Sequence, residues 1–413
     1  MQRAVEPRLC AAVLVLAASL AHAEEAGVDN DSIMFGQSAA FSGPAQDLGI
    51  GVRRGIELAF AEANEAGGVL GRTLELVSLD DAYEPEAAIA NTTELITQEN
   101  VFALIGAVGT PTSRSAVPVA HAENVPYIAP FTGAAFLRDR QWSTVINLRA
   151  SYYQETEKIV DFLTRSLDIN RIGVFYQDDS FGQAGLRGVQ IALERRGLEM
   201  VGTGVYPRNT TAVKTGLLDL RSANPDAVVL VGAYEPVASF ITWAKQIGFE
   251  PHFMTISFVG SNALIEKLGP ASNGIFVTQV VPPPGGDEGA VIIENGLLRT
   301  VGDESSATSP PIVGHYRQLL ARLFPGTPPS YVSLEGYLAG RLVVSILESC
   351  GEPPDRVCFL ETMNDDRVID LGGFSIRFGN DNQGSDAVFL TVVDDQGRYR
   401  KVVETAGGAD GGE

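Results

Sequence analysis

Apolar runs and amphipathic stretches alternate along the chain, and the first complete example lies between residues 33 and 81. A short apolar run opens this segment, and a second one closes it just before a pair of aspartates. Between them, the stretch from Val52 to Ala63 places apolar side chains three or four positions apart, the spacing of one buried helix face. Gly67 and Gly68 follow, and glycine accepts the left-handed conformation that ends many helices. The pattern predicts a strand, a helix and a strand joined as a right-handed parallel unit.

The same alternation recurs through the rest of the chain. Further short runs rich in β-branched residues lack polar alternation, which is typical of strands covered on both faces. They lie at residues 101–106, 125–130, 171–176, 227–232 and 252–256. Strands that alternate with helices predict an α/β fold with parallel sheets. Because the chain has more strand–helix units than a single open sheet usually holds, we predict two lobes with Rossmann-like, parallel-sheet cores.

We expect the chain to cross between the lobes near Asn147–Arg149 and again near Thr278–Pro284, where prolines are followed by glycines. This division gives a first lobe of residues 30–148 and 280–370 and a second lobe of residues 149–279 and 371–404. Other segments are expected to be a surface insertion (285–311), helices (316–324 and 334–349), strands (372–378 and 387–393) and a disordered tail (405–413).

Residues 1–23 have the composition of a secretory signal peptide. Arg3 and Arg8 form a charged start, an apolar core follows, and Ala21 and Ala23 form a small-x-small cleavage site. The apolar core is too short to span a bilayer. We therefore expect a periplasmic protein, exported through a cleavable signal.

Charge and cysteine content narrow the possible roles. The formal net charge of −21 repels phosphate backbones and anionic lipids, which disfavours nucleic-acid binding and membrane-surface roles. Cys350 and Cys358 flank a turn-rich segment of a chain expected in an oxidising compartment, so we predict a small disulfide between them. Two free structural thiols are the alternative.

Catalytic and cofactor signatures are scarce. The sequence has no Gly-x-Ser-x-Gly elbow, phosphate-binding Walker loop or His-Glu-x-x-His zinc motif, and its four histidines are scattered. Residues Gly49–Gly55 resemble a glycine-rich dinucleotide loop, but the third glycine stands one position late and seven residues separate the motif from its strand. We interpret these glycines as helix-packing residues. No enzymatic activity, metal or cofactor is predicted.

Several predicted strand ends carry similar chemistry. Some loops offer small hydroxyls and glycine beside a helix start, which suits a carboxylate or another small anion. Others offer aromatic or acidic groups, and aromatic walls with a few polar donors are typical of small-molecule pockets. The first group comprises Ser42, Thr112, Ser113, Thr132 and Gly133, and the second comprises Tyr152, Glu155, Phe181, Tyr234, Glu235 and Phe258.

Five segments together resemble the periplasmic leucine/isoleucine/valine-binding proteins, the solute receptors of ABC importers. These segments are Ser42–Ala45, Ala63–Gly71, Leu79–Asp81, Ile128–Gly133 and Phe175–Gly182. The resemblance extends from about Asp31 to Val403. It implies a type I periplasmic binding protein fold, with two lobes, three crossovers and a ligand enclosed by hinge closure.

The resemblance also implies a set of ligand contacts. The carboxylate-binding serine of the family falls at Thr112, with Ser113 beside it, and the next contact loop falls at Phe131–Gly133. Three family positions map to changed residues in this sequence. A tyrosine becomes Phe181, a position often occupied by tyrosine is Leu48, and the acidic residue that pairs with the ligand's ammonium group becomes Ser257.

Another tyrosine of the family is kept as Tyr234, and Glu235 beside it is a candidate replacement for the missing acid. A buried ammonium group without a carboxylate partner is costly. The expected ligand is therefore open among a branched-chain or aromatic amino acid, an aromatic acid and a short amide. The expected partner is an ABC permease in the inner membrane, and the expected state is a monomer. A ligand-sensing receptor on the same fold, signalling to a membrane partner, is the alternative function.

Overall fold

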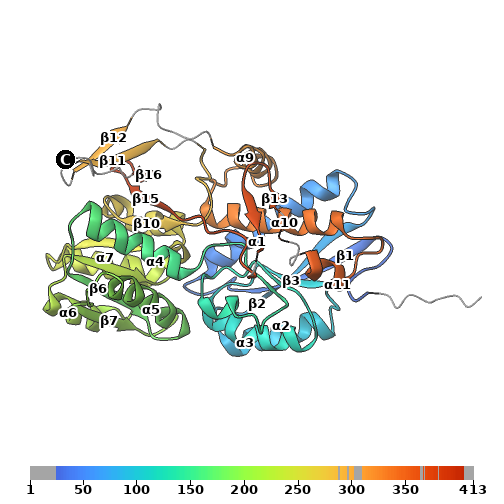
Figure 1. Ribbon diagram of the computed structural model, residues 1–413, viewed down its shortest axis with the longest axis horizontal. Helices are drawn as coiled ribbons and strands as arrows, with labels where there is room; N and C mark the ends of the chain where they lie inside the picture. The colour runs from blue at the N-terminus through green and yellow to red at the C-terminus, as the bar shows by residue number, and fades with distance from the viewer. Residues whose placement is uncertain are drawn as a thin grey trace, which may run out of the picture.

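A computed structural model describes residues 25–286, 289–294, 297–301, 309–362, 366, 368–379 and 381–403. The predicted signal peptide, 1–23, and the predicted tail, 405–413, lie outside the described residues. Two lobes stand side by side, each built on its own sheet (Figure 1). The predicted α/β architecture with parallel sheets is confirmed. No helix in the described part of the chain is long and apolar enough to cross a membrane.

The first lobe holds a parallel five-stranded sheet in the order β2-β1-β3-β4-β5. Its strands are β1 (Ser32–Ala39), β2 (Thr73–Asp80), β3 (Ala103–Ile105), β4 (Tyr127–Ile128) and β5 (Val145–Ile146). Its helices are α1 (Gln46–Glu65), α2 (Pro85–Thr97), α3 (Thr110–Ala122), α9 (Pro311–Leu323), α10 (Tyr331–Ser349) and α11 (Arg356–Glu361). The predicted strand–helix–strand unit over residues 33–81 is therefore β1, α1 and β2.

Glycines allow α1 to pack directly on α10. A Cβ added to Gly55 would lie 2.0 Å from the backbone oxygen of Ser333, and one added to Gly336 would lie 2.2 Å from that of Val52. Gly49 lies equally close to the backbone of Ala40. This close approach confirms that the glycines of residues 49–55 are helix-packing residues.

The second lobe holds a nine-stranded sheet in the order β12-β11-β16-β15-β10-β9-β8-β6-β7. Its parallel part comprises β6 (Ile172–Gln177), β7 (Gly202–Tyr206), β8 (Ala227–Val231), β9 (His252–Thr255) and β10 (Phe276–Gln279). The helices around it are α4 (Tyr152–Asp161), α5 (Ser180–Glu194), α6 (Lys214–Ala223), α7 (Tyr234–Gln246) and α8 (Ser261–Leu268). All five residues of β8 are buried, as expected for a strand covered on both faces.

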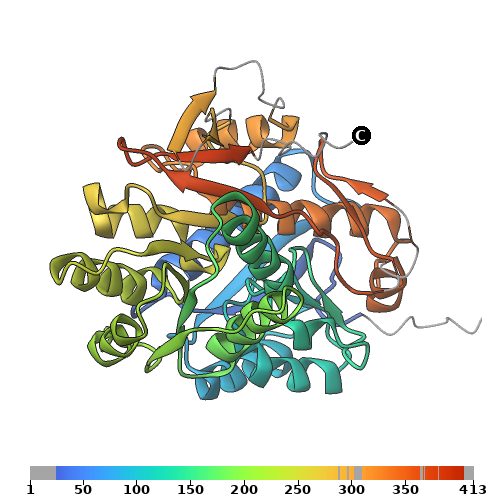
Figure 2. The same cartoon turned by 60° about the vertical axis from the view of Figure 1, so that its left-hand side comes forward.

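The remaining strands of this sheet come from late in the chain. They are β11 (Ala290–Glu294), β12 (Leu297–Val301), β15 (Phe389–Val393) and β16 (Tyr399–Val403). The predicted surface insertion contains the β11–β12 hairpin, which extends the sheet by pairing β11 in parallel with β16. Turning the molecule shows this hairpin above the sheet edge (Figure 2).

Three segments connect the described parts of the two lobes. The first lies between β5 and α4, the second lies between β10 and α9 and contains the β11–β12 hairpin, and the third lies between α11 and β15. In the third, the two-stranded sheet of β13 (Val368–Asp370) and β14 (Ser375–Arg377) packs its turn on α9, so the predicted boundary at residue 370 falls inside this hairpin. The first and third segments run side by side, because the Asn147 N–H donates to the Asn382 carbonyl at 2.8 Å.

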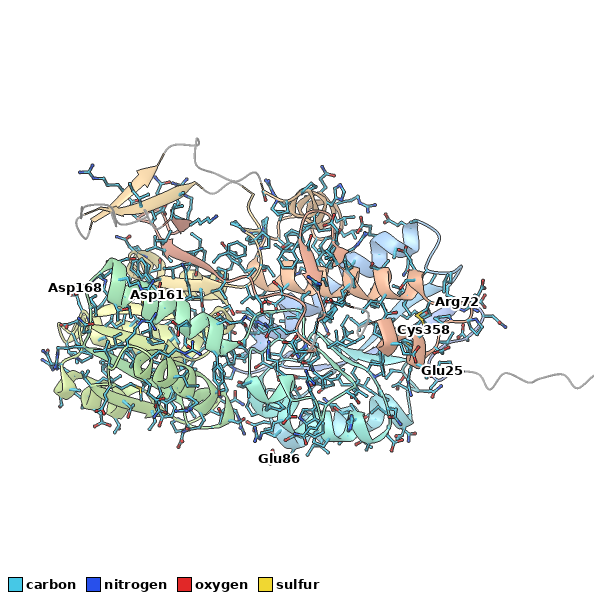
Figure 3. The ribbon with its side chains drawn as sticks, viewed as in Figure 1. Glu25, Arg72, Glu86, Asp161, Asp168 and Cys358 are labelled. Atoms are coloured by element: carbon cyan, nitrogen blue, oxygen red, sulfur yellow. A yellow bond between two sulfur atoms is a disulfide. The ribbon has the colours of Figure 1, made fainter. Side chains whose placement is uncertain are left out.

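A disulfide joins Cys350 at the end of α10 to Cys358 in α11, with their Cα atoms 5.8 Å apart. This confirms the predicted disulfide. The loop that it closes is held to the first lobe, because the guanidinium of Arg356 donates to the carbonyls of Val101 and Phe102 at 2.8 Å each. Figure 3 places Cys358 at the end of the first lobe that faces away from the second.

Candidate functional site

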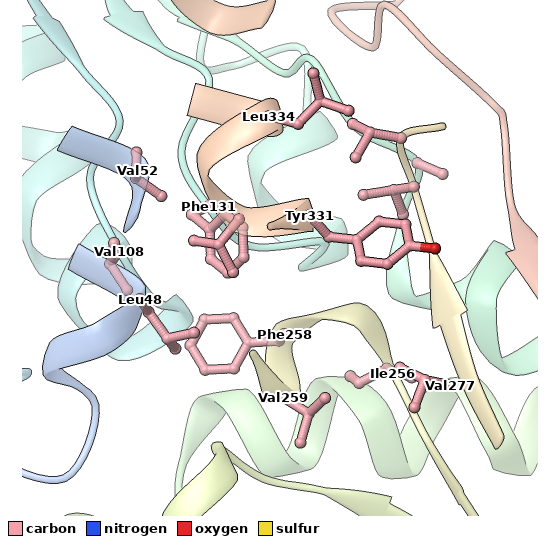
Figure 4. Close-up of a cluster of buried hydrophobic side chains, with 14 of the residues drawn as sticks. Leu48, Val52, Val108, Phe131, Ile256, Phe258, Val259, Val277, Tyr331 and Leu334 are labelled. Atoms are coloured by element: carbon pink, nitrogen blue, oxygen red, sulfur yellow. The ribbon is translucent and has the colours of Figure 1, made fainter. Parts of the chain in front are cut away.

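Aromatic rings from both lobes meet around Phe258, which lies in a short 3-10 turn (Ser257–Val259) after β9. Its ring centroid is 4.4 Å from that of Phe181 in the second lobe. It is also 5.7 Å from the ring of Phe131 and 6.1 Å from that of Tyr83, both in the first lobe. All four side chains are buried. Figure 4 shows Phe258 beside Leu48 and close to Phe131. The predicted residues Phe131, Phe181 and Phe258 therefore share one apolar cluster between the lobes.

The lobes also touch at the start of α1. A Cβ added to Gly260 would lie 2.7 Å from Leu48 and 3.4 Å from Tyr234. The backbone N–H of Asp47 donates to the Tyr234 hydroxyl at 3.3 Å. Tyr234, predicted as a second-lobe contact, therefore binds the N-terminal turn of a first-lobe helix.

A buried group of charges lies next to the aromatic cluster. Arg149 is 1% exposed, and its guanidinium carbon lies 4.7 Å from the centre of the Phe131 ring. Its Nη2 donates to the Ser257 hydroxyl and lies 3.7 Å from Oε1 of Glu155. Its Nε lies 3.5 Å from Oε1 of Glu335 in α10. We call Arg149, Glu155 and Glu335 the hinge charge cluster, because Arg149 lies in the first connecting segment.

Burial and charge act against each other within this cluster. Burial alone would lower the pKa of Arg149, but Glu335 and Glu155 together raise it. Burial raises the pKa of Glu335 to about 7, although the positive charge of Arg149 opposes the rise. Arg149 is therefore charged at neutral pH, whereas Glu335 exchanges its proton near pH 7.

Glu155 supplies a carboxylate at Ser257, the position where the resemblance implies an acidic residue. It accepts hydrogen bonds from the Ser257 N–H at 2.8 Å, the Ser257 hydroxyl at 3.0 Å and the Thr278 hydroxyl at 2.6 Å. Glu235 instead forms an ion pair with Lys267 at 2.5 Å, and both side chains are part-exposed. The structure thus brings Glu155 to the cluster and leaves Glu235 outside it.

The predicted first-lobe hydroxyls have different surroundings. The Thr112 hydroxyl donates to the carbonyls of Val108 and Gly109. The Ser113 hydroxyl accepts from that of Tyr127 at 3.2 Å. Both side chains are therefore engaged within the first lobe. Ser42 is exposed and hydrogen-bonds Asp80.

Thr132 and Gly133 contact the second lobe directly. The Thr132 hydroxyl donates to the Tyr152 hydroxyl at 3.1 Å, and the Tyr152 N–H donates to the Gly133 carbonyl at 2.7 Å. A Cβ on Gly133 would lie 2.7 Å from the Tyr152 nitrogen, so glycine is needed for this approach. These three predicted residues thus meet where α4 begins.

A polar contact outside the aromatic cluster also joins the lobes. Arg208 binds Glu84 at 2.7 Å and lies 3.5 Å from Asp179. The Asn209 amide donates to Glu84 at 2.7 Å and to the Ala82 carbonyl at 3.1 Å. We call Glu84, Arg208 and Asn209 the latch.

Sequence reasoning did not identify Tyr83, the latch, or Arg149 and Glu335 as site residues. A signal existed for Tyr83 and Glu84, since they follow the Asp80–Asp81 pair at a strand end. Arg149 was identified only as part of a crossover. Glu335 lies in a helix whose other residues are largely apolar, and nothing in the local pattern distinguishes it. Within the described ranges, no group of three or more histidine, cysteine, aspartate or glutamate residues is placed to hold a metal ion.

Comparisons with known proteins agree with this architecture. Residues 32–398 match a family model described as "Periplasmic binding protein". The Leu/Ile/Val-binding protein homolog 7 of Brucella suis biovar 1 is 31% identical over 247 residues, which cover 58% of this chain and 61% of that protein. The match thus spans less than two thirds of the relative's length.

Two solved structures cover more of the chain. A possible leucine/isoleucine/valine-binding protein from Rhodopirellula baltica SH 1 is 36% identical, with a TM-score of 0.80 over 91% of this chain and 97% of that one. A substrate-binding periplasmic protein from Ralstonia solanacearum is 27% identical, with a TM-score of 0.79 over 90% and 100% of the two chains. These matches confirm the resemblance and the type I fold predicted from the sequence. The chain therefore belongs to the periplasmic binding protein family, a family of ligand-binding proteins rather than enzymes.

Proposed function

We propose that the protein is an extracytoplasmic solute-binding protein of an ABC importer, which encloses a small amino acid or a related carboxylate or amide between its lobes. The observation that carries this proposal is the composition of the cluster between the lobes. Phe131 and Tyr83 come from the first lobe, whereas Phe181 and Phe258 come from the second. A pocket assembled from both lobes is complete only when they are together.

The proposed mechanism is capture followed by closure. Tyr234 reaches the α1 backbone and Arg208 reaches Glu84 only while the lobes are in contact. A ligand shifts the equilibrium toward this closed form by its differential affinity for the two forms. Closure then presents surfaces of both lobes together to a permease.

The sequence and the relatives support the proposed export and the proposed partner. The predicted signal peptide would deliver the protein to the periplasm as a monomer, and its partner would be an inner-membrane ABC permease. The printed names of the Brucella and Rhodopirellula relatives refer to leucine, isoleucine and valine. These amino acids therefore belong in the first ligand panel, together with aromatic amino acids, organic acids and short amides.

The test uses the chain without residues 1–23, screened against this panel by thermal unfolding and calorimetry. A ligand at a hundred times its Kd stabilises the native state by about 2.7 kcal/mol, which raises the melting temperature by several degrees. A bound ligand should also reduce the radius of gyration measured by small-angle X-ray scattering. A flat thermal response across the panel, with an unchanged radius, would contradict the proposal.

A further inference from the structure

We propose that Arg149 binds the carboxylate of the ligand, so that the solute is a small organic acid with an apolar or aromatic body. This inference rests on the proposed function and specifies the ligand class of the same site. It assigns the carboxylate to the hinge rather than to the first-lobe hydroxyls that the sequence indicated.

The first argument is the unused hydrogen-bonding capacity of Arg149. Its Nη2 donates to Ser257, but Nε and Nη1 are buried and donate to no residue that the structure describes. The Nε contact with Glu335 is an ion pair at 3.5 Å without hydrogen-bond geometry. Buried donors without acceptors are costly, and a hydrogen bond between a guanidinium N–H and a carboxylate is strengthened by charge. Because Nε faces Glu335, a ligand carboxylate would accept from Nη1, the buried donor that faces no acid in the described residues.

The second argument is that Thr112 and Ser113 are already engaged. The hydroxyl proton of Thr112 is directed to backbone carbonyls of its own lobe. Ser113 accepts from Tyr127, deep in the first lobe. A carboxylate accepts hydrogen bonds and donates none. The Thr112 proton therefore reaches a ligand carboxylate only after rearrangement. The Ser113 hydroxyl keeps its own proton, but a neutral hydroxyl forms a weaker hydrogen bond to a carboxylate than the charged guanidinium of Arg149 does.

The third argument is the position of Arg149 beside the aromatic cluster. The guanidinium lies over one ring, Phe131, and that ring contacts Phe258. Phe258 in turn contacts Phe181 and Tyr83. A ligand bound by its carboxylate to Arg149 would therefore place its remaining atoms among these rings, and an apolar or aromatic body fits that environment.

The fourth argument concerns the two acids. Glu155 already accepts three hydrogen bonds from Ser257 and Thr278. Glu335 competes for the open side of Arg149, and its charge opposes the entry of an anion. Because burial raises its pKa to about 7, Glu335 can take up a proton as the ligand binds. Arg149, Glu155 and Arg138 are the charged groups that act on it.

The experiment compares matched acid and amide probes by calorimetry. The pairs are phenylacetate with phenylacetamide, 4-methylpentanoate with 4-methylpentanamide, and leucine with leucinamide. We expect the wild-type protein to bind the acid of at least one pair about tenfold or more tightly than its amide, the scale of a charge-assisted hydrogen bond. Arg149→Met should abolish this preference, and Arg149→Lys should retain part of it.

Two further variants separate binding from folding. Glu335→Gln removes the competing charge and should tighten acid binding several-fold, whereas a merely structural ion pair predicts weaker binding or none. Arg208→Met is the matched control, because it removes a lobe-bridging arginine outside the cluster; it should weaken acid and amide equally. The comparison of Glu335→Gln with the wild type still tests the proposal if Arg149→Met fails to fold.

The outcomes distinguish this inference from the proposed function. Equal binding of acid and amide, or an acid preference that survives in Arg149→Met, would overturn the role of Arg149 and leave the binding function intact. Weaker acid binding by Glu335→Gln would also overturn it. If none of the six probes and no other member of the ligand panel bound, both proposals would fall together.

Discussion

Replacing Glu335 with glutamine should stabilise the protein at alkaline pH and leave it nearly unchanged at acidic pH. Glu335 is buried beside Arg149 and Glu155, and Arg138 also acts on it. Burial is the largest cause of its raised pKa, because the charged carboxylate loses its hydration. Glutamine keeps the shape of the side chain and mimics its neutral form.

The magnitude follows from the pKa. A change from the ordinary value of 4.5 to about 7 corresponds to roughly 3 kcal/mol between the charged and neutral forms. The folded state retains the Glu335 proton over a pH range in which the unfolded chain has released it. The wild type therefore loses stability as pH rises from about 4.5 to about 7. The glutamine variant has no titrating group at this position and does not show this loss. Between pH 5 and pH 8 the variant should gain about 2 to 3 kcal/mol relative to the wild type.

Urea denaturation at pH 5 and pH 8, without ligand, measures this difference. Asp81, whose pKa burial raises to about 6, titrates in both proteins and cancels from the comparison. Glu235→Gln, at the part-exposed ion pair with Lys267, is the control and should change stability by less than about 0.5 kcal/mol at either pH. A stability difference between Glu335→Gln and the wild type that does not vary with pH would refute the reasoning.

Three further predictions follow from separate contacts. Removing the latch ion pair with Arg208→Met or Glu84→Gln should weaken ligand binding about two- to fivefold, because part-exposed pairs contribute up to about 1 kcal/mol. Calorimetry of the two single variants and the double variant measures the coupling between the two residues. Additive losses of binding free energy would contradict a direct interaction between them. Gly55→Ala should destabilise the first lobe by about 1 to 3 kcal/mol, because the added methyl group meets the α10 backbone at 2.0 Å. A melting temperature equal to that of the wild type would show that α1 can shift to accommodate the methyl group. Reducing the Cys350–Cys358 disulfide, whose sequence separation is 8, should cost about 2.5 kcal/mol in the chain-entropy account, and urea unfolding with and without reductant tests this figure.

The alternation of apolar runs and amphipathic stretches predicted most of the fold. Buried strands such as β8 carry their signal in the local sequence, because both faces must be apolar. The β11–β12 hairpin could not be predicted in the same way. Its pairing with β16 joins segments about a hundred residues apart, and the acidic, glycine-rich composition around it is typical of loops.

The candidate site was predicted in part, for a physical reason. Aromatic residues such as Phe131 and Phe181 stand at strand ends, and parallel topology brings strand ends together. The destination of a hydroxyl or carboxylate depends on rotamers and on partners far along the chain. Thr112 turns back to the loop before its own helix, Glu235 turns to Lys267, and Glu155 reaches Ser257 across 102 positions. Local sequence therefore identified the loops more reliably than the direction in which their polar groups point.

The paired connecting segments determine how the lobes can separate. Asn147 and Asn382 join the first and third segments, and the Gly384 N–H donates back to the Asn147 carbonyl at 2.8 Å. Arg138 adds a cross-tie, because it donates to the carbonyl of Arg149 at 2.8 Å and to the side chain of Gln383 at 2.5 Å. A hydrogen-bonded ribbon bends more readily than it shears, so the lobes should rotate about one axis instead of sliding past each other. Arg149 belongs to the first of these segments, so the carboxylate contact proposed for it would couple the charge of the ligand directly to the rotation of the lobes.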